Sequence, residues 1–140
     1  MEQFIEFVSN HWILSSAWVV VCALLLMAHI KHLTNGVRSL VPQEVTHLIN
    51  REDALVVDIR PIADFNKGHI VGSVNIPQSK VTSSSKELEK HKSKPIIIVC
   101  ANGMQAGSVC EQLKKADYTA HKLSGGFQSW LGENLPVVKK

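Results

Sequence analysis

The sequence predicts an α/β domain with a mostly parallel central sheet flanked by helices, preceded by one apolar helix. Short apolar runs end abruptly at residues 57, 76 and 99, as buried strands do. Stretches with apolar residues at helical spacing lie between these runs, and that alternation is typical of a parallel sheet covered on both faces. Roughly a hundred residues follow the apolar helix, which is enough for one compact domain and too few for two.

The first predicted element is a long apolar helix. No charged residue occurs between Glu6 and Lys31, and residues 12–28 are almost wholly apolar. A helix of about 20 residues crosses a hydrocarbon core of about 30 Å. A cleaved signal peptide would begin with basic residues, whereas Glu2 and Glu6 are acidic. A buried core helix is the other alternative, but an apolar helix ahead of the first strand is unusual in a soluble domain. A retained membrane anchor is therefore expected.

Basic residues follow this helix and none precedes it. Lys31 and Arg38 come after it in the sequence, and basic segments next to a span tend to stay in the cytoplasm. The rest of the chain is therefore expected to face the cytoplasm. The predicted organisation is an anchor over 1–32 that spans the membrane at about 12–30, a linker over 33–37 and a domain over 38–140.

The first half of the domain alternates helix and strand. Pro42 suits the first turn of a helix, and the apolar run that ends at Asp58 is typical of a strand buried on both sides. Gly68 and Pro77 interrupt regular structure. The predicted elements are a helix from Pro42 with Val45, Leu48 and Ile49 on one face, a strand over 54–57, one or two helical turns over 61–66 and a strand over 74–76.

The second half repeats this alternation around a more polar stretch. Residues 78–85 are rich in serine and without apolar periodicity, which predicts an exposed loop, and residues 86–94 are charged enough for a solvated helix or turn. The remaining predicted elements are a strand over 96–99, a helix with an inward stripe of Ala106, Val109, Cys110, Leu113 and Ala116, a strand over 118–123 and a closing helix carrying Phe127, Trp130 and Leu131.

Cys100 is the candidate nucleophile. It follows the apolar run 96–99 directly and opens a loop of small residues in which Gly103 frees the backbone to curl, so that several amides and a helix start can stabilise a thiolate. The alternative is a small apolar core residue, the commoner fate of a cysteine. Its place at the carboxyl end of a strand favours the reactive interpretation. The predicted anion-binding loop comprises Ala101, Asn102, Gly103, Met104, Gln105 and Ala106.

The remaining chemistry-bearing residues predict neither a metal nor a cofactor. Cys22, Cys100 and Cys110 are an odd number without a CxxC pair, which favours neither a disulfide framework nor a zinc site, and His29 with His32 supplies only two ligands. Cys110 lies at a core position of its predicted helix; the alternative is a thiol that resolves an oxidised Cys100. Phosphate-binding glycine motifs are absent, and a scattered net charge of +3 does not favour nucleic acid as a partner.

Four motifs together resemble the rhodanese, or sulfurtransferase, homology domain. In order and spacing they cover nearly all of residues 38–138. With the apolar helix added, the chain is similar to bacterial single-domain members anchored in the inner membrane. The motifs are Val57-Asp58-Ile59-Arg60, the stretch from Gly68-His69 to Ile76-Pro77, the Cys100 loop, and Gly125-Gly126-Phe127 through Trp130 to Leu135-Pro136-Val137.

This resemblance implies a sulfurtransferase. A thiolate at Cys100 would take the outer sulfur of a small sulfane-sulfur donor, carry it as a persulfide and pass it to a thiol or another nucleophilic acceptor. Asp58, Arg60 and His69 match family positions, and we expect them to support the structure. Many members carry a basic residue where this chain has Gln105, so weaker affinity for an anionic donor is expected.

The sequence also bears on two functions other than sulfur transfer, a non-catalytic adaptor and a cysteine phosphatase. A non-catalytic adaptor that binds a membrane-protein partner is the alternative, motivated by Gln105 and by the anchor. A cysteine phosphatase is disfavoured because such enzymes clamp a dianion with an arginine six positions after the cysteine, where this chain has Ala106.

Overall fold

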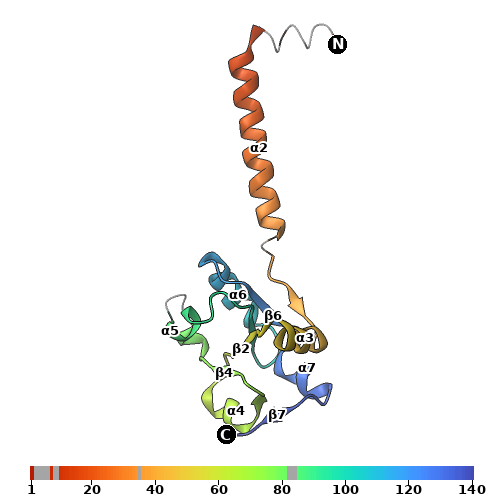
Figure 1. Cartoon of the computed structure of the whole chain (residues 1–140), viewed down its shortest axis with the longest axis vertical. Coiled ribbons are helices and arrows are strands. Elements are labelled where there is room, and N and C mark those ends of the chain that lie inside the picture. Colours follow the sequence, from red (N-terminus) through yellow and green to blue (C-terminus); the bar gives the residue numbers. More distant parts are fainter. Residues whose placement is uncertain (2–6, 8–9, 35, 82–84) are drawn as a thin grey trace. The chain divides into compact units, whose positions relative to one another are not determined.

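The computed structural model describes residues 1, 7, 10–34, 36–81 and 85–140, and the side chains of 31–34 are not described. Two compact units, Met1–Gly36 and Val37–Lys140, divide the chain. The first contains α2 (Trp12–Thr34; Figure 1). Within it, Trp12–Ile30 is long and apolar enough to cross a membrane, and its large apolar side chains are exposed. The acidic residues Glu2 and Glu6 lie outside the described residues.

A five-stranded parallel sheet forms the centre of the second unit, in the order β1-β6-β5-β2-β4. A separate antiparallel pair joins β3 to β7. The predicted α/β architecture with a parallel central sheet is confirmed. The strands are β1 (Ser39–Leu40), β2 (Leu55–Asp58), β3 (His69–Ile70), β4 (Val74–Asn75), β5 (Ile96–Val99), β6 (Ala120–Leu123) and β7 (Val137–Val138).

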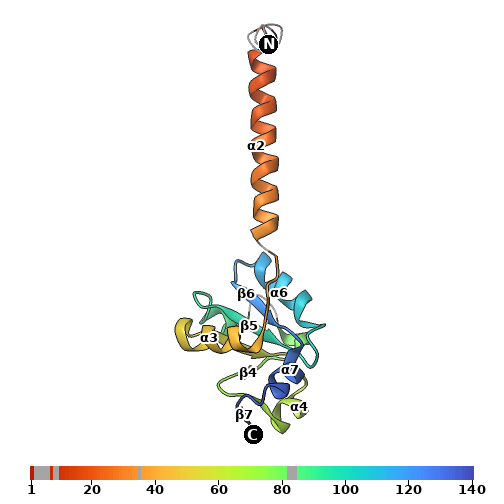
Figure 2. The ribbon, with the colours of Figure 1, turned by 90° about the vertical axis from the view of Figure 1, so that its right-hand side faces the viewer.

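Helices connect and cover these strands (Figures 1 and 2). Local chemistry sets their ends: Pro42 opens α3, the Glu44 carboxylate accepts the Val41 N–H at 3.1 Å, and Asp53 ends the helix in a left-handed conformation with φ 52°. The helices are α3 (Pro42–Glu52), α4 (Ile62–Lys67), the 3₁₀ turn η1 (Gln78–Lys80), α5 (Lys86–Glu89), α6 (Ala106–Lys115) and α7 (Gly126–Gly132).

The core has two halves, one on each face of the sheet. Ile96 and Ile98 of β5 point into the half that α5 and α6 cover, and Ile97 and Val99 point into the half that α3 and α7 cover. All four side chains are fully buried. This alternation fixes the register of the central strand, because a shift by one residue would exchange the two halves. The end of β5 is therefore a rigid mount for Cys100.

Several short elements differ from the sequence-based expectations. The strands β1, β3 and β7 have two residues each, which is too short for a periodic pattern to predict. The expected exposed loop over 78–85 begins instead as the 3₁₀ turn η1, and Val81 is buried beneath it. That part of the prediction was wrong, because one apolar side chain anchors the segment. Residues 82–84 lie outside the described residues.

Candidate functional site

Cys100 stands directly after β5, at the carboxyl edge of the sheet. Its Sγ accepts a hydrogen bond from the backbone N–H of Gly103 at 3.0 Å. Gly103 has a φ of 87°, a conformation that glycine adopts at little cost. The positive φ turns this amide back toward the sulfur. An N–H directed at sulfur stabilises the thiolate more than the neutral thiol, because hydrogen bonds to charged acceptors are the stronger ones.

The other loop residues predicted to bind an anion do not all face the sulfur. The Met104 N–H donates to the Asn102 side-chain oxygen at 3.1 Å, so this amide is used within the loop. Ala101, Asn102, Met104 and Gln105 are exposed, while Gly103 is half-buried and Ala106 is buried as the first residue of α6. The structure thus brings the amide of Gly103 to Sγ and leaves the outer side of the loop open to solvent.

Cys100 itself is only 1% exposed and belongs to the core half beneath α6. A thiol in this position is protected from bulk solvent.

A turn of two glycines braces the loop from the other side. The Phe127 N–H donates to the Cys100 carbonyl at 2.8 Å, and the Gln128 N–H donates to the Ala101 carbonyl at 3.3 Å. A Cβ added at Gly126 would lie 2.4 Å from the Cys100 carbonyl oxygen and 2.6 Å from the Gly103 nitrogen. Only glycine fits at this contact, where the backbones of α7 and the loop meet.

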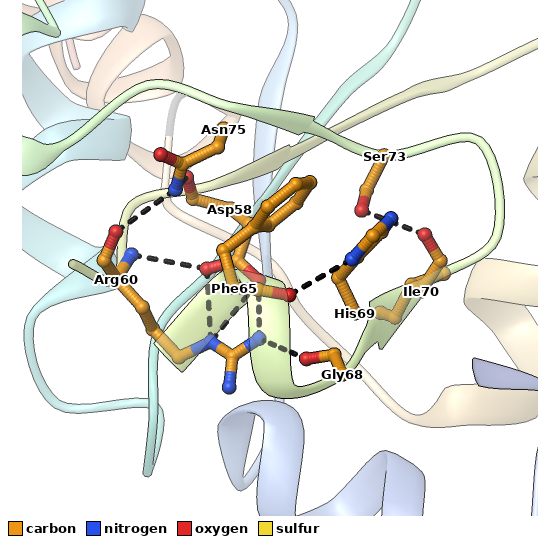
Figure 3. Close-up of polar contacts among 8 residues, drawn as sticks. All are labelled: Asp58, Arg60, Phe65, Gly68, His69, Ile70, Ser73 and Asn75. Atoms are coloured by element: carbon orange, nitrogen blue, oxygen red, sulfur yellow. Dashed lines mark hydrogen bonds and ion pairs between the residues drawn. The ribbon is translucent and has the colours of Figure 1, made fainter. Parts of the chain in front are cut away.

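Asp58 and Arg60 form a buried ion pair that ties this region together (Figure 3). The Arg60 Nη2 donates to Asp58 Oδ2 at 2.7 Å and to the Gly68 carbonyl at 2.8 Å. The Arg60 guanidinium carbon also lies 3.9 Å from the ring centroid of Phe127. Because the Phe127 amide holds the Cys100 carbonyl, the pair positions α7 against the loop. In this arrangement the two side chains brace neighbouring segments.

His69 lies away from the sulfur. Its Nδ1 donates to the Phe65 carbonyl at 2.9 Å, and the two rings stack with centroids 3.8 Å apart (Figure 3). The ring is 8% exposed. The structure therefore places His69 with α4 and not with the Cys100 loop.

Cys110 is fully buried on α6, in the same core half as Cys100. Burial raises the pKa of the Cys110 thiol to about 12, because the apolar surroundings disfavour the thiolate. A thiol in this state is a poor nucleophile at neutral pH. Among the described residues, no group of three or more His, Cys, Asp and Glu side chains is placed to hold a metal ion.

The sequence did not single out Gly125, Gly126 and Phe127 as parts of the site, although they contact the loop. Two consecutive glycines just before a closing helix are the signal that could have found them, since such a pair indicates a close backbone approach. The assembled arrangement is a thiol at a strand end, one amide directed at its sulfur, and a glycine turn that holds the loop.

Known proteins are similar to this chain in sequence. The model of the Rhodanese-like domain matches residues 41–133. The uncharacterized protein YibN of Escherichia coli K12 is 43% identical over 141 residues, which cover 99% of both chains. The thiosulfate sulfurtransferase GlpE of Coxiella burnetii is 25% identical over 88 residues, which cover 62% of this chain and 80% of GlpE.

Solved structures share the fold. A rhodanese-related protein from Thermoplasma volcanium superposes with a TM-score of 0.65 at 28% identity, covering 74% of this chain and 99% of its own. The family match spans the sheet strands from β2 to β6, the Cys100 loop and α7. On these grounds the chain belongs to the rhodanese-like family, whose members include sulfurtransferases.

Proposed function

We propose that the protein is a membrane-anchored sulfurtransferase that carries sulfane sulfur as a persulfide on Cys100. The observation that carries this proposal is the hydrogen bond from the Gly103 N–H to Sγ at 3.0 Å. Membership of the rhodanese-like family supports it. The backbone amide supplies electrostatic stabilisation to an anionic sulfur without any cofactor.

The proposed reaction has two balanced displacements. The Cys100 thiolate attacks the outer sulfur of a donor and a new S–S bond forms. The bond between that sulfur and the rest of the donor breaks, and the rest of the donor leaves as an anion. An acceptor thiolate then attacks the outer sulfur of the persulfide, and the Cys100 thiolate departs. One sulfur atom moves from donor to acceptor, and no external oxidant or reductant is needed. Sγ is therefore charged before the first displacement and again after the second, and in both states it lies next to the Gly103 amide.

The loop chemistry bears on the donor. Residues 101–106 contain no cationic side chain, and Gln105 offers only neutral hydrogen bonds where a guanidinium would pair with a dianion. Without a cationic side chain in the loop, the binding affinity for a singly charged persulfide or polysulfide falls less than the affinity for the doubly charged thiosulfate. We expect a persulfide donor to react faster than thiosulfate.

The apolar helix supports a proposal for where the protein is located. Trp12–Ile30 has the length and composition of a span, and Arg38 follows it on the domain side. We propose that the anchor lies in the bacterial inner membrane, as a single pass, with the second unit in the cytoplasm. Cytoplasmic conditions keep Cys100 and Cys110 reduced, which sulfur transfer needs.

The test is sulfur transfer by the full chain in detergent micelles. A low-molecular-weight persulfide is the donor and a small thiol is the acceptor, and the rate of acceptor persulfide formation is compared with that of Cys100→Ser and Cys110→Ser. The proposal expects Cys100→Ser to fall to the uncatalysed rate and Cys110→Ser to keep most of the activity. A folded wild-type protein that transfers no sulfur from either persulfide or thiosulfate would refute it.

The burial of Cys100 at 1% exposure favours a second candidate, an adaptor that binds a membrane protein without catalysis. The two candidates separate in cells that lack the protein. An adaptor predicts that Cys100→Ser restores the cellular phenotype as well as wild type does. A sulfurtransferase predicts no restoration, with both proteins present at equal levels in the membrane.

A further inference from the structure

A pocket lies beside His69, and it is lined by other residues than the Cys100 loop. Its volume is about 460 Å³, and segments far apart in the sequence meet there: α4, the β3–β4 region and the residues after β7. None of its lining residues belongs to the loop over 100–106. They are Ile62, Phe65, His69, Ser73, Val74, Asn75, Lys139 and Lys140.

The polar side chains of this wall have already used their donors inside the protein. His69 Nδ1–H donates to the Phe65 carbonyl, and the Ser73 hydroxyl donates to the Ile70 carbonyl at 2.7 Å. The Asn75 amide donates to the carbonyls of Asp58 and Arg60, at 3.1 and 2.9 Å (Figure 3). What remains for a ligand is a set of acceptors: the imidazole Nε2 of His69, the hydroxyl oxygen of Ser73 and the amide oxygen of Asn75.

His69 is more than nine-tenths buried, and its Nε2 has no hydrogen-bond partner among the described residues. Nε2 is not one of the fully enclosed unpartnered nitrogens, so it is reachable from the pocket. In the neutral imidazole, the bond from Nδ1 to the Phe65 carbonyl places the proton on Nδ1, which leaves Nε2 as an acceptor. A ligand hydroxyl can donate to this nitrogen in place of water.

Two ammonium groups stand at the same pocket. The β3–β7 pairing sets Val138 opposite His69, and the Lys140 N–H donates to the Asn66 carbonyl at 3.2 Å, which holds this segment against α4. Neither Lys139 nor Lys140 has an ion-pair partner among the described residues. The nearby carboxylate on α4, Asp64, pairs with Lys67 at 3.5 Å. The two lysines therefore offer positive charge to a ligand.

We propose that this pocket binds a polyhydroxylated oxyanion, such as a sugar acid or a sugar phosphate. Its hydroxyl groups would donate to the wall of acceptors formed by His69, Ser73 and Asn75, and its carboxylate or phosphate would pair with Lys139 and Lys140. The apolar side chains of Ile62, Phe65 and Val74 would face its carbon skeleton. The site is independent of sulfur transfer, because it shares no residue with the Cys100 loop.

The test follows the side-chain nitrogen resonances of His69 by NMR in the full chain in detergent micelles. Gluconate and glucose 6-phosphate are titrated against hexanoate, which has the carbon count and charge of gluconate without its hydroxyls. We expect saturable shifts at His69 Nε2 with gluconate or glucose 6-phosphate, and none with hexanoate. The ligand of these two that binds more tightly shows whether the site prefers a carboxylate or a phosphate. Equal binding of hexanoate, or no saturable shift with any of the three, would overturn the proposal.

Variants separate this site from charge effects elsewhere. The double variant Lys139→Gln/Lys140→Gln is expected to weaken binding about tenfold, as the loss of two exposed ion pairs allows. Lys80→Gln removes an exposed lysine of η1 that does not line the pocket and is expected to change nothing. Cys100→Ser is expected to bind as wild type does. Equal weakening by Lys80→Gln and by the double variant would contradict the site.

Discussion

The proposed chemistry depends on close backbone contacts made by glycines as much as on the cysteine. Gly103 turns its amide to the Cys100 sulfur through a positive φ, and Gly126 leaves the space that the loop carbonyl and amides occupy. Each role is available only to a residue without a Cβ. The geometry around the thiol therefore requires glycine at both positions.

Gly126→Ala is expected to displace the Cys100 loop. The added Cβ would meet backbone atoms at 2.4 to 2.7 Å, and φ at this position is 62°, so we expect a loss of stability of about 1–3 kcal/mol or more. Persulfide formation should fall with it. The measurements are chemical denaturation and sulfur transfer. Gly132→Ala is the matched control on the same helix, because a Cβ there meets nothing within 4 Å; equal effects of the two variants would contradict the account.

Asp58→Asn is expected to be among the most destabilising polar substitutions of the domain. It leaves the Arg60 guanidinium buried without its counter-charge, and breaking a buried pair in this way typically costs about 3–5 kcal/mol. Chemical denaturation measures the loss. The control is Asp64→Asn, which breaks the exposed pair with Lys67 and should cost less than about 1 kcal/mol. Similar losses in the two variants would show that Asp58 does not brace the fold.

Among the elements, those with strong patterns were predictable from the sequence. The runs that became β2 and β5 are continuous and buried on both faces, and α6 carries a clear stripe of buried residues. The antiparallel pair β3–β7 was not predictable. It pairs His69 with Val138, which lie far apart in the sequence. A pairing of only two residues leaves no local sequence pattern. The pocket beside His69 depends on that pairing and was missed for the same reason.

The helix α6 carries a buried thiol whose ionisation should appear in the alkaline stability of the domain. The pKa of Cys110 is raised from 9.0 to about 12 by burial, so the unfolded chain loses this proton at a lower pH than the folded one. The stabilising contribution is full below pH 9.0 and is lost as the pH rises toward about 12. Chemical denaturation as a function of pH measures it.

The comparison pairs Cys100→Ser with Cys100→Ser/Cys110→Ala, so that the Cys100 thiol is absent from both proteins. The double variant should lose less stability between neutral pH and strongly alkaline pH. Parallel pH profiles for the two proteins would show that Cys110 ionises equally easily in both states.

The whole chain combines an apolar helix with a polar domain, and the helix requires an apolar environment. Its large side chains are exposed over Trp12–Ile30, which is unfavourable in water. We expect the full chain to remain in the membrane pellet after alkaline carbonate extraction. Leu24→Lys/Leu25→Lys should release it, because each charge at the centre of a span costs about 2.5–3.5 kcal/mol. Leu131→Lys, on the surface of the domain, should not; extraction of the wild-type chain would contradict the anchor.

The candidate site was predictable only in part, because sequence shows which residues share a loop and not which atoms meet. Cys100 and Gly103 stand out in a short stretch after an apolar run. The brace at Gly126 lies 26 residues from Cys100 in the sequence, and the burial of the sulfur depends on how α6 and the loop pack over it. Both features come from tertiary contacts.

The most direct measurement is peptide-level mass spectrometry of the full chain after exposure to a persulfide donor, with the excess donor removed before digestion. The account predicts one additional sulfur atom on the peptide that contains Cys100, none on the peptide that contains Cys110, and loss of the added sulfur on treatment with a thiol acceptor. A folded protein that carries no added sulfur on Cys100, or carries it on Cys110 instead, would contradict the account.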